Sequence, residues 1–279
     1  MQINPNDYYA LYGLSNLAYI NKQPQRCLEI SCKLLQLPLE EREEEEEHLY
    51  INYVWALKSL GDAEKASTIC LSGLQRYPND PTLLMEHAGL LYQKREWQKA
   101  EAAYDKVGQH PRFRANAQGG RAACLFELGN RKQAIEIAKI ALVQSPESAY
   151  LHHCLGLFTL REGFQEKALD HAKSACLLAP DHANYLFELG FLLALRKEFT
   201  SALTHFERAF CLDAEHIQAR IFIALCHQAL GEPELCNQEL QNLIALDTAS
   251  VVEAIEEIAL RGGYSHLMEE TLKTLKSQR

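Results

Sequence analysis

The chain has little positive charge and no long apolar run. Its 279 residues contain 28 Lys and Arg against 37 Asp and Glu, which gives a formal net charge of −9. An acidic chain has no general electrostatic attraction for nucleic acid or anionic lipid, so we expect no nucleic acid as a partner. No apolar run reaches the length of about 18 residues that a membrane-spanning helix needs. We therefore expect no insertion into a membrane.

Signals for secretion, disulfide pairing and catalysis are also lacking. The sequence does not open with a basic segment followed by an apolar one, so we expect no secretory signal. The nine cysteines are scattered and form no Cys-x-x-Cys pair, which is typical of free thiols in a reducing compartment. Gly-x-Ser-x-Gly, His-Glu-x-x-His and phosphate-cradling glycine loops are absent from the sequence. We predict a cytoplasmic, non-enzymatic protein with no catalytic residue, no cofactor and no metal site.

The negative charge is concentrated in one segment. Residues 40–47 contain seven Glu and one Arg, a net charge of −6, which leaves −3 for the rest of the chain. Like charges one helical turn apart repel each other. We interpret the run as a solvated insertion, and a binding patch is the less favoured alternative.

A period of 34 residues organises the chain. One series of small residues keeps this spacing and comprises Ala66, Ala100, Ala134, Ala168, Ala202 and Cys236. A glycine series keeps the same period with two positions filled by other residues, and comprises Gly61, Gly129, Gly163 and Gly231. Apolar residues recur at helical spacing on both sides of each glycine position. Each unit is therefore predicted to be a helix–turn–helix hairpin, whose apolar face is covered by the next hairpin in a solenoid.

These positions resemble the tetratricopeptide repeat family. In the unit 149–182 the matching residues are Leu155, Gly156, Ala168, Ala172, Ala175 and Pro180. The resemblance implies an all-α, right-handed α-solenoid of helix–turn–helix hairpins, with seven repeats and capping helices at the C-terminus. We expect a single superhelical domain over 1–279. Its expected parts are a divergent first repeat at 8–41, an acidic insertion at 42–46, six regular 34-residue repeats over 47–250 and a cap at 251–279.

In this family the first helix of each hairpin lines the concave surface. Repeat phase therefore predicts the residues of a partner-binding groove, which are Tyr12, Asn16, Tyr19, Asn52, Trp55, Tyr150, His153, Leu157, Phe187, Phe191, Ile221 and Phe222. Such an apolar and aromatic groove suits a helix or an extended peptide with hydrophobic anchors. We expect part of this set to be core instead. The Gly119–Gly120 pair is predicted to let a ligand backbone come close.

Two other uses of these residues are disfavoured. Some family members grip acidic peptide tails with Lys, Arg and Asn, and Asn16 and Asn52 stand at the amide positions here. The positions of the cations hold Tyr12, Thr82 and Glu86, which give no charge-assisted grip on a carboxylate. Histidines spaced by 34 residues fall on neighbouring hairpins, too far apart to share a metal ion.

The function predicted from the sequence is a scaffold or adaptor that binds a partner peptide or helix. Two alternatives stay open. One is an accessory subunit or a fragment of an enzyme system, such as a glycosyl- or sulfotransferase or a secretion machinery. The other is a solenoid that associates with itself as a homo-oligomer.

Overall fold

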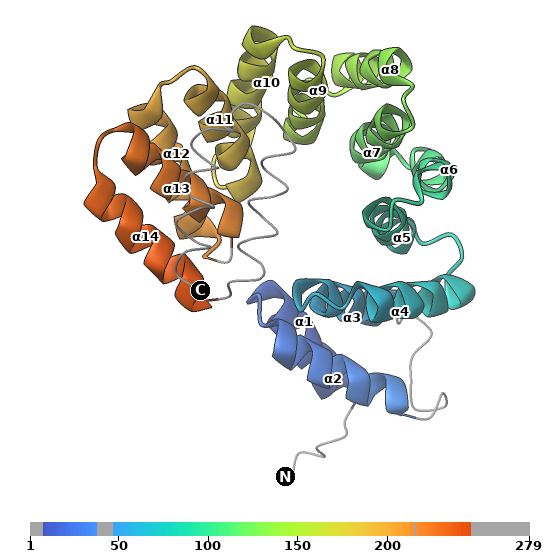
Figure 1. Cartoon of the computed structure of the whole chain (residues 1–279). Helices are drawn as coiled ribbons and strands as arrows, with labels where there is room; N and C mark the ends of the chain where they lie inside the picture. The colour runs from blue at the N-terminus through green and yellow to red at the C-terminus, as the bar shows by residue number, and fades with distance from the viewer. Residues whose placement is uncertain (1–7, 38–46, 215, 247–279) are drawn as a thin grey trace. The chain divides into compact units, whose positions relative to one another are not determined.

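The computed structural model describes residues 8–37, 47–214 and 216–246. These residues form α-helices and one short 3-10 helix, Pro111–Phe113, with no strand among them, so the predicted all-α class is confirmed (Figure 1). The acidic insertion at 42–46 and the cap at 251–279 lie outside the described residues. The chain divides into two compact units, residues 1–144 and 145–279, and a single domain over 1–279 stays a prediction.

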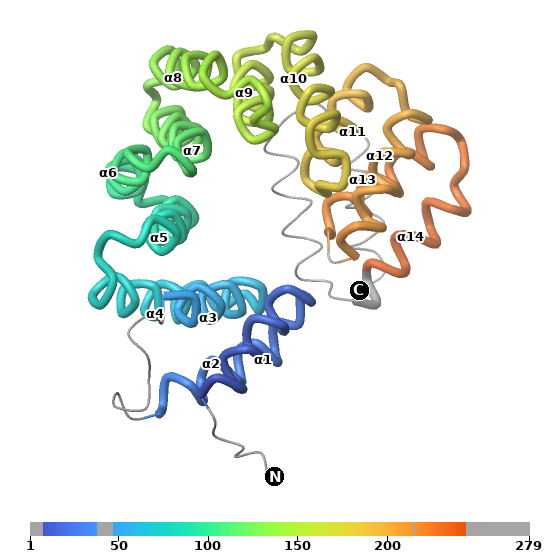
Figure 2. Tube along the Cα trace, turned by 180° about the vertical axis from the view of Figure 1, so that it is seen from behind, coloured from blue at the N-terminus to red at the C-terminus, as the bar shows by residue number. Residues whose placement is uncertain are grey.

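Each unit is built from consecutive helix pairs (Figures 1 and 2). The helices of the first unit are α1 (Tyr8–Ile20), α2 (Pro24–Gln36), α3 (Glu47–Ser59), α4 (Ala63–Arg76), α5 (Pro81–Gln93), α6 (Trp97–Val107), α7 (Arg114–Glu127) and α8 (Arg131–Gln144). The helices of the second unit are α9 (Ala149–Arg161), α10 (Gln165–Leu178), α11 (Ala183–Leu195), α12 (Phe199–Leu212), α13 (Ile217–Ala229) and α14 (Pro233–Leu246).

Every described hairpin turns in the same way. The residue after the turn donates its backbone N–H to the carbonyl five residues earlier, as Asp62 does to Leu57 at 2.9 Å and Phe164 does to Thr159 at 2.8 Å. This is the bond of the Schellman motif, which requires a left-handed residue just before the donor. The glycine series occupies that position with φ between 79° and 88°. The hairpins without glycine use Lys22, Arg95 and Lys197 there, with φ of 52°, 60° and 64°.

Small residues let neighbouring helices approach closely, both within a hairpin and between hairpins. The alanine series is fully buried, since Ala66, Ala100, Ala134, Ala168 and Ala202 are each 0% exposed. Glycines inside helices serve the same purpose, because an aromatic ring lies directly over each of three of them. The ring-over-glycine pairs are Tyr50 over Gly73, Tyr104 over Gly120 and Phe206 over Gly190.

The Gly119–Gly120 pair is therefore not an opening for a ligand backbone. A Cβ at Gly120 would lie 2.5 Å from the Tyr104 ring, which is much shorter than a van der Waals contact. The sequence prediction for this pair is wrong, because the space beside Gly120 is filled by a side chain of α6.

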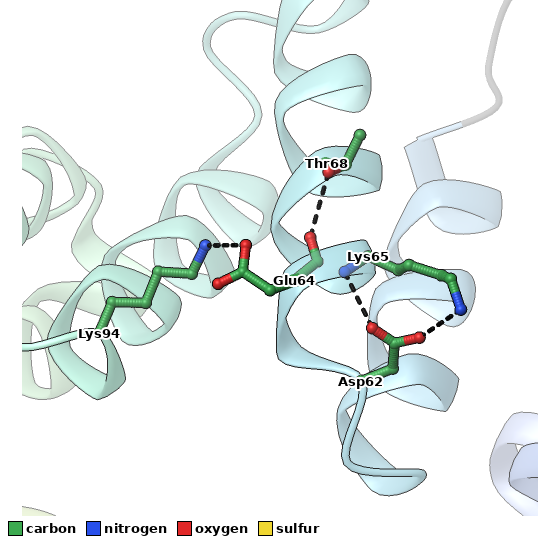
Figure 3. Close-up of polar contacts among 5 residues, drawn as sticks. All are labelled: Asp62, Glu64, Lys65, Thr68 and Lys94. Atoms are coloured by element: carbon green, nitrogen blue, oxygen red, sulfur yellow. Dashed lines mark hydrogen bonds and ion pairs between the residues drawn. The ribbon is translucent and has the colours of Figure 1, made fainter.

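Ion pairs join consecutive hairpins at equivalent positions. Lys94 Nζ lies 3.0 Å from Glu64 Oε2, which links the end of α5 to the start of α4 (Figure 3). Arg196 and Glu166 make the corresponding pair in the second unit, also at 3.0 Å. The carboxylate of each pair is largely exposed, so each pair contributes at most about 1 kcal/mol. Beside the first pair, Asp62 accepts a hydrogen bond from the backbone N–H of Lys65 and caps α4 (Figure 3).

Candidate partner-binding surfaces

In the first unit the predicted aromatic residues form two ring contacts. Tyr19 on α1 meets Trp55 on α3 edge to face, with ring centroids 4.9 Å apart and planes at 78°. Tyr12 stacks on Tyr8 at 5.9 Å. Tyr19 is 39% exposed and Trp55 is partly exposed, so part of each ring is accessible to solvent.

The two predicted asparagines contact each other. Asn52 Nδ2 donates a hydrogen bond to Asn16 Oδ1 at 2.7 Å and another to Ser15 Oγ at 3.2 Å. Asn52 is 4% exposed, whereas Asn16 is partly exposed. Asn52 therefore joins α3 to α1, and only Asn16 of the two can also reach a partner.

A buried polar network continues behind these amides. Ser15 Oγ lies 3.0 Å from Ser31 Oγ on α2, and both residues are 0% exposed. The Cys27 thiol donates to the backbone carbonyl of Asn52 at 3.5 Å. Burial raises the pKa of Cys27, while hydrogen bonds with Ser15 and Ser31 act in the opposite direction. The only sign of this network in the sequence is the small-residue position that Cys27 fills.

In the second unit, four predicted groove residues are core residues instead. Phe187, Phe191, Ile221 and Phe222 are 4%, 6%, 0% and 1% exposed. They belong to one large hydrophobic cluster of α10 to α14. Phe222 is packed between aromatic rings, 5.1 Å from Phe206 and 5.5 Å from Phe191. Since almost none of their surface is accessible, we do not retain these four as contact residues.

A small hollow opens beside the other predicted residues of this unit. Its cavity volume is about 10 Å³, and it lies between α9, α10 and α11. The residues that line it are His153, Gly156, Leu157, Leu160, Ala172, Ala175, Tyr185, Glu188 and Leu192. The walls are mostly apolar and the polar groups are few, as in sites that hold a side chain in a fixed orientation. Tyr150 is partly exposed on α9 and is not part of the lining.

Burial shifts the pKa of two polar groups that line this hollow. It lowers the pKa of His153 to about 4, with a smaller contribution from His182. It also raises the pKa of Tyr185 to about 12. Tyr185 is sandwiched between imidazoles, with its ring centroid 3.8 Å from His182 and 5.0 Å from His153. At neutral pH the hollow therefore presents a neutral imidazole and a neutral phenol.

One histidine pair lies outside the repeat pattern that the sequence reveals. His152 Nδ1 and His171 Nδ1 lie 3.1 Å apart across the α9–α10 hairpin. They are 19 residues apart in the chain, whereas the histidines considered from the repeat are 34 apart. Within the described ranges, no group of three or more His, Cys, Asp or Glu is arranged to hold a metal ion.

The basic side chains near α7 are partly neutralised. Arg121 pairs with Glu101 of α6 at 2.6 Å and with Asp105 at 3.0 Å.

No helix of the residues that the structure describes is long and apolar enough to cross a membrane.

Comparison with protein-family models finds no match. Superkiller protein 3 of Schizosaccharomyces pombe is 23% identical over 288 aligned positions, which cover 96% of this chain and 20% of that protein. The probable biofilm formation methyltransferase WspC of Pseudomonas putida is 36% identical over 87 residues, 31% of this chain and 20% of that protein. The chain thus spans 20% of the length of each of these curated relatives.

Solved structures show the same fold at low sequence identity. TTC0263, a thermophilic TPR protein of Thermus thermophilus, has a TM-score of 0.58 and 21% identity, and the match covers 66% of this chain and 98% of that one. A monomeric mutant of IFIT1 solved with m7Gppp-AAAA has a TM-score of 0.65 and 18% identity, over 92% of this chain and 64% of that one. At such identities the likeness concerns the fold alone.

Proposed function

Because the chain has the tetratricopeptide-repeat fold, we propose that it is a non-enzymatic scaffold that binds a partner peptide or helix through apolar and aromatic contacts. The hollow beside His153 and Leu157 is the observation that carries this proposal. An apolar side chain of the partner would pack against its leucine and alanine walls. Since the hollow is too small to enclose that side chain, the contact would contribute less than the about 1.5–3 kcal/mol of full burial.

The polar groups of the hollow would orient the partner. His153 is neutral at pH 7 because burial lowers its pKa to about 4, so it can exchange a hydrogen bond with a peptide group. Glu188 lies at the same opening and is partly exposed. Since His153 is uncharged at this pH and most of the lining is apolar, we expect salt to weaken the complex only slightly.

The first unit supplies a second proposed contact surface. The Tyr19–Trp55 pair presents partly exposed aromatic rings, and Asn16 and Tyr12 lie on the same helix as Tyr19. Aromatic side chains with a nearby amide are typical of surfaces that anchor a partner peptide. We propose that this surface and the hollow act separately, each on its own segment of a partner.

The proposal can be tested without knowing the natural partner. Displayed libraries of 16-residue peptides would be selected on the wild-type chain, and the affinity of the selected peptides would be measured by calorimetry. Leu157→Asp places a charge in the hollow and should weaken binding at least about tenfold, since tenfold corresponds to 1.4 kcal/mol.

Leu177→Asp is the matched control. It makes the same chemical change on α10 at a side chain that is 83% exposed and is not part of the hollow. Peptides that bind wild type and Leu157→Asp equally would contradict the assignment of the hollow. A steep loss of affinity with added salt would contradict the apolar mechanism.

An accessory role in an enzyme system is the second candidate function. The match to part of a protein named a probable methyltransferase supports it, because repeats of this kind can stand beside a catalytic chain. A natural reading frame that continues past Arg279 into a catalytic domain would favour this candidate.

The expected lack of nucleic-acid binding stays a prediction. The acidic composition supports it, whereas the similarity to IFIT1, solved with m7Gppp-AAAA, argues for testing it. The cytoplasmic location also stays a prediction, based on the nine scattered cysteines.

A further inference from the structure

The first helix carries an exposed apolar face. Leu17 is 54% exposed and Ile20 is 69% exposed, and Ala10 is exposed as well. A Cβ on Gly13 would meet no atom within 4 Å, so the space beside this glycine is open. Positions 10, 13, 17 and 20 follow the alternating three- and four-residue spacing of a seam between two packed helices. We call these four residues the α1 seam.

The first three of these positions are buried in α3, whereas Ser59, the counterpart of Ile20 there, is exposed. In α3 they are Leu49, Asn52 and Ala56, which are 0%, 4% and 0% exposed. Ala56 packs with Ala18 and Cys27 of the hairpin before it. In α5 the corresponding Leu90 packs in one cluster with residues of α3 and α4. Each of these helices therefore uses this face to pack on the preceding hairpin, and the α1 seam continues that type of interface.

The last position of the seam differs from its counterparts in the nearest first helices. These counterparts are polar or charged in α3, α5, α7 and α9, namely Ser59, Gln93, Glu127 and Arg161, and apolar in α11 and α13, namely Leu195 and Ala229. In α1 the position holds Ile20, so the apolar surface extends to the end of the helix. A side chain of this kind, 69% exposed at the end of an apolar seam, favours a protein contact over open solvent.

The seam is complementary to itself in one orientation only. Its N-terminal half holds the small residues Ala10 and Gly13, and its C-terminal half holds the large residues Leu17 and Ile20. We propose that two copies of this chain form a homodimer in which the α1 seams pack antiparallel about a two-fold axis at the level of Ser15. Leu17 of each copy then lies over Gly13 of the other, and Ile20 lies over Ala10. A parallel arrangement would put large residues against large and small against small.

The charge of α1 favours a second copy as the occupant. The helix contains no Asp, Glu, Lys or Arg, so two copies meet without like-charge repulsion along the seam. A closed two-fold contact also buries the same surface on both chains. One face of a 13-residue helix is smaller than the standard interface of about 800 Å² per partner, so the dimer is expected to be weak. This proposal is independent of the hollow, which lies in the other unit.

Sedimentation and light scattering of the whole chain test the proposal. We expect the mass to rise from 31.7 kDa toward twice that value as the concentration increases, over about 1–200 µM for a weak interface. Leu17→Glu/Ile20→Glu should abolish this rise while circular dichroism stays unchanged. Val143→Glu and Leu177→Glu change side chains that are 83% exposed on α8 and α10, and should leave it intact.

A monomer at every concentration would overturn the proposal and leave the seam to a helix of another protein. A dimer that survives the Leu17→Glu/Ile20→Glu change would overturn it equally, since another surface would then be responsible. Orientation is tested with Gly13→Cys and Leu17→Cys in a Cys211→Ser background, because Cys211 is exposed. We expect a disulfide to form faster in the mixture of the two variants than in either alone. Faster linking within a single variant would overturn the antiparallel arrangement.

Discussion

Asn52 on α3 donates its side-chain amide to Asn16 on α1 across 2.7 Å. The bond joins the first two hairpins, whose first helices are separated by five residues more than the regular period, since α1 begins at Tyr8 and α3 at Glu47. Ser15 and Ser31 extend the contact into α2, so the divergent first repeat is fixed to the array by side chains as well as by apolar packing.

Loss of this amide should destabilise the first unit. Asn52→Ala leaves the buried Ser15 hydroxyl with one hydrogen bond fewer, and we expect a cost of about 1–3 kcal/mol in the free energy of unfolding. Asn16→Ala should cost less, because Asn16 is partly exposed and water can replace its contact. Urea unfolding of both single variants and the double variant measures the coupling between them. An Asn52→Ala chain as stable as wild type would contradict the structural role of this bond.

The left-handed residue of the hairpin turn predicts that alanine substitution will have different effects on stability in two hairpins of the second unit. Gly163 has φ of 85° and no atom within 4 Å of a Cβ, so Gly163→Ala changes only backbone strain. We expect a loss of about 1 kcal/mol. Lys197 occupies the same position with φ of 64°, so it already has a Cβ there. Lys197→Ala should therefore change stability by less than about 0.5 kcal/mol. Equal losses in the two variants, measured by thermal unfolding, would refute this explanation.

The close approach at Gly120 predicts overpacking. Gly120→Ala would put a Cβ 2.5 Å from the Tyr104 ring and should destabilise the chain by about 1–3 kcal/mol. Gly89→Ala is the control, because its Cβ would lie 3.8 Å from the Tyr104 hydroxyl, an ordinary contact. That change should be neutral or stabilising, since alanine is the better helix former. Tyr104→Leu should partly rescue the stability of Gly120→Ala, and a lack of rescue would point to another cause.

The buried imidazole of His153 predicts a pH dependence of stability. Its pKa falls from 6.5 to about 4 on folding, so between these values the unfolded chain binds a proton that the folded chain does not. Stability should therefore fall as the pH is lowered from 6.5 to 4, by about 2–3 kcal/mol for this group. His153→Leu should flatten this part of the profile in chemical unfolding. Identical profiles for wild type and His153→Leu would contradict the prediction.

We expect no measurable binding of m7Gppp-AAAA. The chain carries a net charge of −9, and Arg121 is already paired with Glu101 and Asp105. Fluorescence anisotropy at low salt, where phosphate contacts are strongest, is the sensitive measurement. Micromolar binding that weakens steeply with salt would show that the exclusion of nucleic acid is wrong.

The architecture could be predicted from the sequence because the 34-residue period reflects the local geometry of each hairpin. Small residues recur where helices cross and glycine recurs where the turn is left-handed, and both requirements are visible without a structure. The two positions without glycine looked like gaps in the pattern. They are occupied by Arg95 and Lys197, which adopt the same backbone conformation.

The candidate site was predicted less accurately, because helical phase gives the direction of a side chain but not how deeply it is buried. Phe187 and Phe222 have the helical phase of groove residues, yet the ring of Phe206 on a second helix packs against both. Gly190 permits that approach, and a glycine inside a helix signals it only once its neighbour is known. The contacts of Asn52 with Asn16 and of His152 with His171 likewise depend on how helices pair in space.

The constant turn of the hairpins also bears on how such a chain evolves. Extra residues precede α3, between two hairpins, while α9, α11 and α13 begin at 149, 183 and 217 in strict period. A recombination event that adds or removes 34 residues preserves every buried position, and additional length at a joint between hairpins is tolerated. A single-residue deletion within a helix would instead rotate all later side chains of that helix by about 100°. Genetic variation in this protein should therefore accumulate as whole repeats and as joints of unequal length.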